Sequence, residues 1–377
     1  MTKTSISFLL LLLPLGMFAQ RNGKTTPPTT IQVALQPDHW NFKPGTVDFS
    51  TYKSVPAMKI LNSPDTAVLK NLDFRDGTIS YDIEPVDPYF TSFYFRRSSQ
   101  QENECFYFRT ALSGNGEAVQ YTPYIDGINL WDMLPQYQTA AWFQRDQWNH
   151  VKLVISGKRM QVFVNDTTRP VLDIPQLEGN VWHGALAFSG QVIISNLVVQ
   201  PGQTGGLSPE PLADITDNDP RYIRRWLASV PEVVTTLTDY NYSNAPGKDA
   251  TWKPIWAERN GLINLTRQLG GQRDRNRRIV WLKTNIHSAV AQTRKLKLGF
   301  SDNVWVFLNG KYVYVGKNTY GSPIMKEPAG RCSVDNTSFD LPLVEGDNEV
   351  MIAVFNDFYG WGIIAQVDRF ERLLFEK

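Results

Sequence analysis

The sequence has 377 residues, and this length suggests about two domains of ordinary size. Its 38 lysines and arginines nearly balance its 37 aspartates and glutamates, which gives a net charge of +1. That balance offers no electrostatic attraction for nucleic acid or for an anionic membrane, so neither is expected as a partner. Aromatic residues make up 12% of the chain; aromatic side chains fill sandwich cores, and their flat faces also stack on sugar rings.

The N-terminal segment has the features of a cleaved export signal. Lys3 supplies a positive charge, residues 6–15 are largely apolar, and Ala19 is a small residue at the expected cleavage point. The apolar run is too short to remain in a bilayer, and no later stretch reaches the length of a membrane span, so membrane insertion is not expected. We therefore expect residues 1–20 to be removed and the mature chain to be periplasmic or secreted. No cysteine follows the cleavage point, so no lipoprotein anchor is predicted.

The two cysteines, Cys105 and Cys332, lie far apart in the sequence. An exported protein can join such residues in a disulfide, but we expect these two in different domains. The interpretation we prefer is therefore two buried, unpaired thiols.

Residues 31–200 alternate apolar and polar side chains over short distances. In 78–84, for example, Ile79, Tyr81 and Ile83 alternate with polar residues. The same pattern occurs at 93–97, 105–111, 151–155, 160–164 and 192–199. Many short strands separated by turn residues predict a β-sandwich over 31–200.

Residues 201–232 are expected to be a Gly/Pro-rich linker that ends in a short helix. The first part combines glycines and prolines with a run of Asp and Asn, which is typical of a linker. Asp219 can cap a helix whose first position is Pro220. The helix is predicted over 222–229, and Pro231 ends it.

From residue 233 to 377 the β pattern returns. The apolar run 279–282 suits a strand that is covered on both faces, and Asn309-Gly310 is a strong signal for a type I′ hairpin turn. Further strands are expected at 296–300, 304–308, 312–315, 350–355 and 363–367. The predicted fold is therefore all-β, with two β-sandwich, jelly-roll domains joined by a linker and a short helix.

The first half resembles the laminin-G or concanavalin-A-like sandwich of exported bacterial proteins, a group that includes 3-keto-disaccharide hydrolase-like domains. The matching phrases are FRDGTI at 74–79, ECFYFR at 104–109, QWNHVK at 147–152, VFVN at 162–165 and ISNL at 194–197. They span most of residues 40–200. The resemblance implies a sandwich of a kind that often handles carbohydrate.

The second half is similar to galactose-binding-like jelly-roll modules that accompany glycoside hydrolases. Its typical phrases are SD at 301–302, VFLNGK at 306–311, GDN at 346–348 and GWG at 360–362. They cover roughly residues 233–370. Both families are functionally mixed, so the fold carries over better than any activity.

Two Tyr-x-Arg pairs make the main candidate surface for a ligand. Because side chains alternate along a strand, Tyr94 lies on one face with Arg96, and Tyr107 on one face with Arg109. If the strands pair, these residues form a patch that can stack on a ring and donate to hydroxyls or a carboxylate. The alternative is structural arginines that bond to the backbone or to nearby glutamates.

Further aromatic candidates lie in two loops. Tyr124 and Trp131 belong to a long aromatic segment, 121–142, of the kind on which sandwich proteins mount binding sites; a hydrophobic flap is the alternative. Trp361 lies between Gly360 and Gly362, which can leave its ring open to a sugar. The alternative for Trp361 is burial in a core strand.

No pattern for catalysis or for a cofactor is evident in the sequence. Glycosidases need two carboxylates at a defined separation, and no characteristic strand motif for them occurs. The four histidines show neither metal-ligand nor triad spacing. The Asp/Asn clusters at 217–219, 301–303 and 347–348 can hold a structural Ca²⁺ or serve as turns.

Three hypotheses of function follow. The first is an exported protein that binds glycan through aromatic and Arg surfaces. The second is a glycoside hydrolase acting on a keto-disaccharide or related glycan, and the third is a structural or interaction module without a sugar ligand. Convergent carboxylates in a first-domain groove would favour the hydrolase, and exposed aromatics would favour binding. Aromatics that are all buried would favour the third hypothesis.

The export prediction has a direct test. N-terminal sequencing of the mature protein from its native host is expected to begin near Gln20, because cleavage follows Ala19. A mature chain that retains Met1 would contradict the predicted location.

Overall fold

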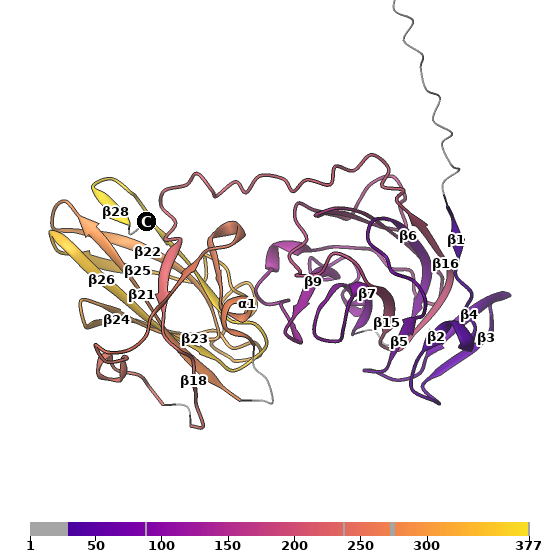
Figure 1. Ribbon diagram of the computed structural model, residues 1–377, viewed down its shortest axis with the longest axis horizontal. Coiled ribbons are helices and arrows are strands. Elements are labelled where there is room, and N and C mark those ends of the chain that lie inside the picture. The colour runs from indigo at the N-terminus through magenta and orange to yellow at the C-terminus, as the bar shows by residue number, and fades with distance from the viewer. Residues whose placement is uncertain (1–28, 87–88, 237, 272–275, 376–377) are drawn as a thin grey trace, which may run out of the picture.

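The computed structural model describes residues 29–86, 89–236, 238–271 and 276–375. The predicted export signal, residues 1–20, lies outside the described residues. The chain forms two β-sandwich domains that lie side by side, connected by a segment that runs along both of them (Figure 1). In this described part, no helix is long and apolar enough to cross a membrane.

The first domain consists of two antiparallel sheets that pack face to face. In spatial order, the first sheet contains β14 (Leu172–Ile174), β13 (Arg159–Val164), β12 (Asn149–Ser156), β6 (Gly77–Pro85), β16 (Val192–Pro201), β4 (Val55–Ile60) and β3 (Val47–Tyr52), with β1 (Ile31–Gln32) beside β16. The second contains β10 (Ile128–Asn129), β9 (Val119–Ile125), β8 (Asn103–Phe108), β7 (Thr91–Arg97), β15 (Ala185–Ser189), β5 (Thr66–Leu69) and β2 (Trp40–Asn41), with β11 (Gln138–Thr139) beside β9.

The second domain also has two antiparallel sheets. The larger contains β19 (Lys253–Trp256), β17 (Arg225–Ala228), β21 (Arg278–Ser288), β26 (Gly346–Asn356), β23 (Asn303–Leu308) and β24 (Lys311–Lys317), with β18 (Glu232–Val233) and β28 (Leu373–Phe375) beside β21. The smaller contains β20 (Leu262–Asn264), β27 (Gly362–Val367), β22 (Gln292–Ser301) and β25 (Ser338–Leu343). Helical structure is limited to α1 (Leu265–Leu269) and to the 3₁₀ turns η1 (Pro37–His39), η2 (Thr110–Leu112), η3 (Pro135–Tyr137), η4 (Tyr242–Asn244) and η5 (Arg259–Gly261) in the described residues.

The period-two patterns produce the strands that they predicted. In β6 the residues Ile79, Tyr81 and Ile83 are buried in the first-domain core, and the polar residues between them face outward. Asn309 and Gly310 both have positive φ, 50° and 76°, as a type I′ turn between β23 and β24 requires. The prediction of an all-β fold with two sandwich domains is confirmed.

Strand β21 is covered on both faces, as its continuous apolar run predicted. Val280 and Leu282 lie in the core between the two second-domain sheets. Ile279 and Trp281 lie in a separate cluster on the opposite face, against which Tyr240 packs. The segment that precedes β21 thus covers a sheet face that would otherwise be exposed.

The helix predicted over 222–229 is wrong. Residues Arg225–Ala228 form β17, which pairs with β19 on one side and with β21 on the other. Trp226 and Ala228 are buried at alternate positions, which is the period of a strand. The Asp219 carboxylate is bonded to the guanidinium of Arg221 (2.6 Å) and so stabilises a turn. Pairing with two neighbouring strands outweighs the local helix signal, and this segment belongs to the second domain.

The connecting segment after β16 is bonded to both domains. Pro209 and Pro175 accept hydrogen bonds from the backbone N–H groups of Lys158 and Leu212 respectively, at 2.9 and 3.0 Å. Leu212 then accepts a bond of 2.7 Å from Arg259 of the second domain. The segment is therefore held along its length rather than only at its ends.

The two domains share a buried apolar contact. Leu262, Ile364 and Cys332 of the second domain belong to the same core cluster as Leu130 and Met133 of the first. Both cysteines are free and buried, as the sequence predicted.

A buried ion pair adds to this contact. Arg331 of the second domain is fully buried and donates to both carboxylate oxygens of Glu117 of the first domain, at 3.1 and 3.2 Å. The same guanidinium lies 5.0 Å from the ring centre of Trp131, again across the junction. Bidentate geometry of this kind fixes orientation as well as distance.

The substitution Arg331→Met is expected to lower the free energy of unfolding by about 2–3 kcal/mol, because Glu117, which is only partly buried, loses one of its two charged partners. Chemical denaturation should also separate the transitions of the two domains. The control is Arg369→Met, whose side chain is 67% exposed. Equal midpoints for the two variants would show that this pair does not hold the domains together.

Candidate functional site

A cavity of about 630 Å³ lies between the outer face of the second sheet and loops of the second domain. The face is set by alternation in β7, where Phe93 and Phe95 point into the core while Ser92 and Tyr94 line the cavity. Its aromatic lining comes from both domains: Phe90, Tyr94, Tyr107, Tyr124 and Trp131 from the first, and Tyr320, Phe358 and Tyr359 from the second.

Five of the seven predicted site residues line this one cavity. They are Tyr94, Tyr107, Arg109, Tyr124 and Trp131. Tyr94, Tyr107 and Tyr124 come from adjacent strands, because β7 pairs with β8 and β8 pairs with β9, and Arg109 directly follows β8. The Tyr94 and Tyr124 rings meet edge to face at 5.8 Å.

Arg96 does not belong to this surface. Ala187 pairs with Tyr94 and Ala185 with Arg97, so β7 has one residue more than β15 between these partners, which is a β-bulge. At the bulge Arg96 has φ 47° and turns inward. It is 1% exposed and donates to the carbonyls of Arg75 and Gly157, each at 2.8 Å. The bulge brings Arg97 instead to the face of Tyr94.

Trp361 does not belong to it either. Its ring is fully buried in the second-domain core, and its Nε1 donates to the Gly270 carbonyl at 3.0 Å. The flanking glycines serve a close approach between the domains: a Cβ on Gly360 or on Gly362 would lie 2.6 or 2.8 Å from Met133. The expectation that Trp361 offers its face to a sugar is corrected accordingly.

Trp131 forms the wall between the two domains. Its ring lies within 4.9 Å of Tyr320, 5.9 Å of Tyr359 and 6.4 Å of Phe358, measured between ring centres, and all three contacts are edge to face. Tyr320 and Phe358 are in turn stacked at an interplanar angle of 8°. A first-domain tryptophan thus inserts among second-domain aromatics and positions them around the cavity.

Arg109 is anchored by Glu117. Its Nε donates to the Glu117 carbonyl at 2.9 Å, and its Nη2 lies 3.0 Å from Oε2 in a geometry that makes an ion pair but no hydrogen bond. The guanidinium carbon lies 5.7 Å from the Tyr107 ring centre and 5.9 Å from that of Phe90. Burial raises the pKa of the Tyr107 hydroxyl, which stays protonated.

Sequence reasoning missed several lining residues. Asn103 could have been found, since it occupies the same face of β8 as Tyr107 and Arg109. Arg97 could not be found from strand alternation, because the bulge that exposes it involves a distant segment, where Gly184 packs against the backbone of Arg96 and Arg97. Tyr320 and the 357–359 loop reach the cavity only through the docking of the second domain.

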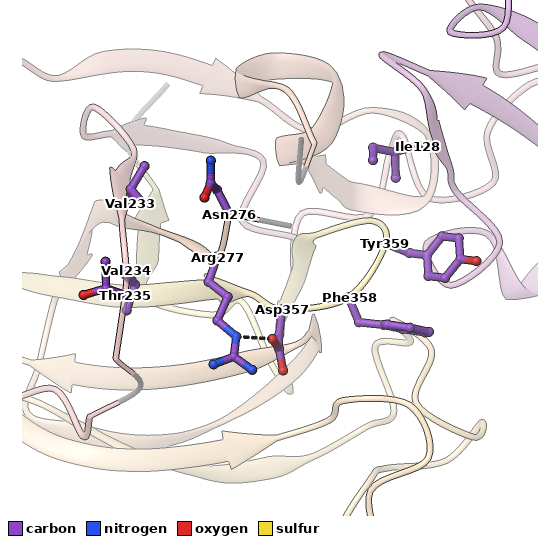
Figure 2. A pocket seen from close by; sticks show the side chains of 9 residues that line it. All are labelled: Ile128, Val233, Val234, Thr235, Asn276, Arg277, Asp357, Phe358 and Tyr359. Atoms are coloured by element: carbon purple, nitrogen blue, oxygen red, sulfur yellow. Dashed lines mark hydrogen bonds and ion pairs between the residues drawn. The ribbon is translucent and has the colours of Figure 1, made fainter. Parts of the chain in front are cut away.

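The 357–359 loop also lines a second depression, of about 680 Å³, which Figure 2 shows. Both hollows are lined by Phe358 and Tyr359. Figure 2 shows Arg277 reaching Asp357, with 2.6 Å between Nε and Oδ1. In the second depression Arg277 is paired with Asp357, and only two of the eight aromatic residues of the first, Phe358 and Tyr359, are present.

The strongly perturbed carboxyl groups lie outside the cavity. Glu104 is on the opposite face of β8, fully buried, and accepts from Tyr121 at 2.7 Å; its burial raises the pKa to about 7. Asp132 and Asp302 lie at the domain junction, where burial raises the pKa of each, that of Asp302 to about 7. Such pKa values suit general acids, but none of these groups lines the cavity.

The carboxylates on the outer face of β6 are held by local partners. Asp82 lies 2.7 Å from His150 Nδ1, and Glu84 accepts from Tyr52 at 2.6 Å and from Lys53. These contacts explain both residues as parts of a partly solvated sheet face.

The Asp/Asn clusters serve turns and loops. The Asp302 carboxylate accepts from the backbone N–H groups of Asp357 and Phe358, at 2.5 and 2.7 Å. Asn348 bonds the backbone of Val344 in both directions. Within the described ranges, no three His, Cys, Asp or Glu side chains come together as a metal site.

No protein-family model matches the sequence, and no curated protein matches it. Among solved structures, the carbohydrate-binding module CBM66 from Bacillus subtilis is similar over 43% of this chain and 91% of its own, with 11% identity and a TM-score of 0.30. Bacillus licheniformis β-glucanase is similar over 48% of this chain and 100% of its own, with 10% identity and a TM-score of 0.33.

Domain 4 of AbnA, an extracellular arabinanase from Geobacillus stearothermophilus, is similar over 46% of this chain and 82% of its own, with 12% identity and a TM-score of 0.29. The chain is thus similar in part to carbohydrate-binding modules and to glycoside hydrolases. Similarity at this level neither identifies a ligand nor assigns an activity.

The buried Glu104 predicts a pH dependence of stability. Its pKa is about 7 in the folded chain and about 4.3 in an unfolded one. Between these values the folded state binds more protons, so the free energy of unfolding falls as pH rises from about 4.5 to 7.

The substitution Glu104→Gln keeps an acceptor for Tyr121 and should remove on the order of 3 kcal/mol of this decline. Asp132 and Asp302 would account for the slope that remains. The measurement is urea denaturation at a series of pH values, with the exposed Glu345→Gln as control. An unchanged slope in Glu104→Gln would contradict the assignment.

Proposed function

We propose that this protein binds a carbohydrate in the cavity between its two domains. The observation that carries the proposal is the lining itself, which combines eight aromatic side chains with hydrogen-bonding groups at the outer face of one sheet. Sugars present apolar ring faces and hydroxyl edges, and this lining matches both. The cavity volume, about 630 Å³, is within the range typical of small-molecule sites, ~300–1,000 Å³.

Aromatic faces are available at the rim. Phe90 is 52% exposed, Tyr320 42% and Tyr359 41%. They come from both domains and border the same opening. An interaction module without a sugar ligand gives no reason for exposed rings to gather around a polar cavity.

Buried polar groups that line the cavity can form hydrogen bonds with sugar hydroxyls. Asn103 is 2% exposed, its amide nitrogen donates to the carbonyls of Ser99 and Gln100, and its Oδ1 has no hydrogen-bond partner among the described residues. A buried acceptor without a donor is costly. A sugar hydroxyl at this position would satisfy it.

The lining does not support hydrolysis by paired carboxylates. Two acidic side chains on opposite sides of the scissile bond are needed for that mechanism. Among the described residues that line the cavity, none is Asp or Glu. Binding is therefore the function that the site supports best.

Two further parts of the proposal concern the whole chain. We propose that it is exported after cleavage of residues 1–20, which agrees with a glycan ligand outside the cytoplasm. We also propose that the second domain is a galactose-binding-like jelly roll. Its role here is to supply one wall of the cavity.

The test is a glycan array on the mature protein, followed by calorimetry with a glycan that it binds. The substitution Tyr320→Ala is expected to weaken the affinity about ten-fold, a loss of ~1.4 kcal/mol from ring stacking and burial. The matched control is Tyr312→Ala: Tyr312 is 52% exposed, outside the cavity lining, and packs edge to face on Phe307 at 5.4 Å.

The control variant should bind as the wild type does. Absence of binding to any glycan on the array, or equal losses in the two variants, would overturn the proposed function.

A further inference from the structure

Arg97 is the one lining residue of this cavity whose charge has no counter-charge among the described residues. Its guanidinium makes neither a hydrogen bond nor an ion pair with them, in contrast to the neighbouring Arg96 with its three bonds. No Asp or Glu acts on it: burial is the main influence on its pKa, which it lowers. Arginine nevertheless remains protonated at neutral pH.

The charges around the cavity do not balance. Arg97 and Arg109 line it, and Arg331 lies behind Trp131 in its wall. Among the described residues, Arg109 and Arg331 share one carboxylate, that of Glu117, and Arg97 has none in contact. The cavity therefore has an excess of positive charge.

The position of Arg97 indicates that this charge serves a ligand. A β-bulge, with Arg96 in the left-handed region of φ, is needed to turn Arg97 outward beside Tyr94. Arg97 is half-buried, and the planar fork of donors of an arginine matches carboxylate and sulfate oxygens. Asn103, with its unpaired buried acceptor, lines the same cavity and offers a contact for a hydroxyl of the same ligand.

We propose that the cavity selects an anionic sugar, with Arg97 donating to a carboxylate or sulfate group while Asn103 accepts from a hydroxyl. This inference rests on the proposed glycan-binding function and specifies its ligand class. The aromatic rim would stack on the sugar rings. The excess positive charge would favour an acidic glycan, and a neutral glycan could still bind.

Two matched ligand pairs test the inference on the full mature chain. One pair is an oligogalacturonate and its methyl ester, and the other is a sulfated galactan oligosaccharide without uronate and its desulfated form. The acidic member of at least one pair is expected to bind about ten-fold or more tightly than its neutral partner, with an affinity that falls as salt increases. The pair that discriminates identifies the anionic group as carboxylate or sulfate.

The variants assign the selectivity to one residue. Arg97→Gln should abolish most of the preference for the acidic ligand, measured as the ratio of its affinity to that of its neutral partner, and Arg97→Lys should restore part of this ratio. Arg169→Gln makes the same change in net charge on a side chain that is 91% exposed and outside the cavity lining, and should keep the preference.

The outcomes separate the two proposals. Equal affinity for the acidic and neutral members of both pairs in the wild type would overturn the anionic-sugar inference alone, and this comparison needs no variant. Equal loss of preference in Arg97→Gln and Arg169→Gln would also overturn it. Failure of the wild type to bind any ligand of either pair, or any glycan on the array, would overturn both.

Discussion

The close approach of residues 130–133 to Gly360 and Gly362, just before β27 and at its start, is the constraint on which the rest of the site depends. Met133 occupies the space that a Cβ on Gly360 or Gly362 would need. That approach places Trp131 among Tyr320, Phe358 and Tyr359. Because interiors are close-packed, a methyl group at either glycine would push the Met133 side chain away. The cavity wall thus depends on the absence of a Cβ at these two positions.

Electrostatics reinforce this packing in two ways. Glu117 lies between Arg109, which lines the cavity, and Arg331, which belongs to the other domain, so one carboxylate links the ligand surface to the junction. Asp302 fixes the loop that carries Phe358 through two backbone N–H groups. Neither carboxylate lines the cavity, but removal of either one would shift the aromatic side chains that form its wall.

The sequence predicts what depends on local periodicity and misses what depends on a distant partner. The alternation of Ile79, Tyr81 and Ile83 and the Asn309-Gly310 turn each reflect backbone preferences that the fold keeps. The supposed helix at 222–229 has a good local start signal, but Trp226 and Ala228 gain more from strand pairing in the core. Propensity is a weak prior wherever two strand neighbours are available.

The candidate site shows the same division. Tyr107 and Arg109 follow from strand alternation alone, and the structure places both in the cavity. One inserted residue exchanges the faces of Arg96 and Arg97, and the glycine that packs against this bulge, Gly184, lies on the partner segment, far away in the sequence. Glycines beside Trp361 fit an open ring and a tight contact equally well, and only the packing of Met133 decides between them.

A site built from two domains couples binding to docking. A ligand that contacts Tyr94 on one side and Tyr320 on the other binds only the docked arrangement of the two domains. It therefore stabilises that arrangement, and the stabilisation free energy grows with the ratio of ligand concentration to dissociation constant. Conversely, any population of undocked molecules lowers the apparent affinity by the same fraction. The buried Arg331–Glu117 pair and the glycine contacts therefore contribute to ligand affinity although they lie behind the cavity wall, because they keep the two halves of the site assembled before the ligand arrives.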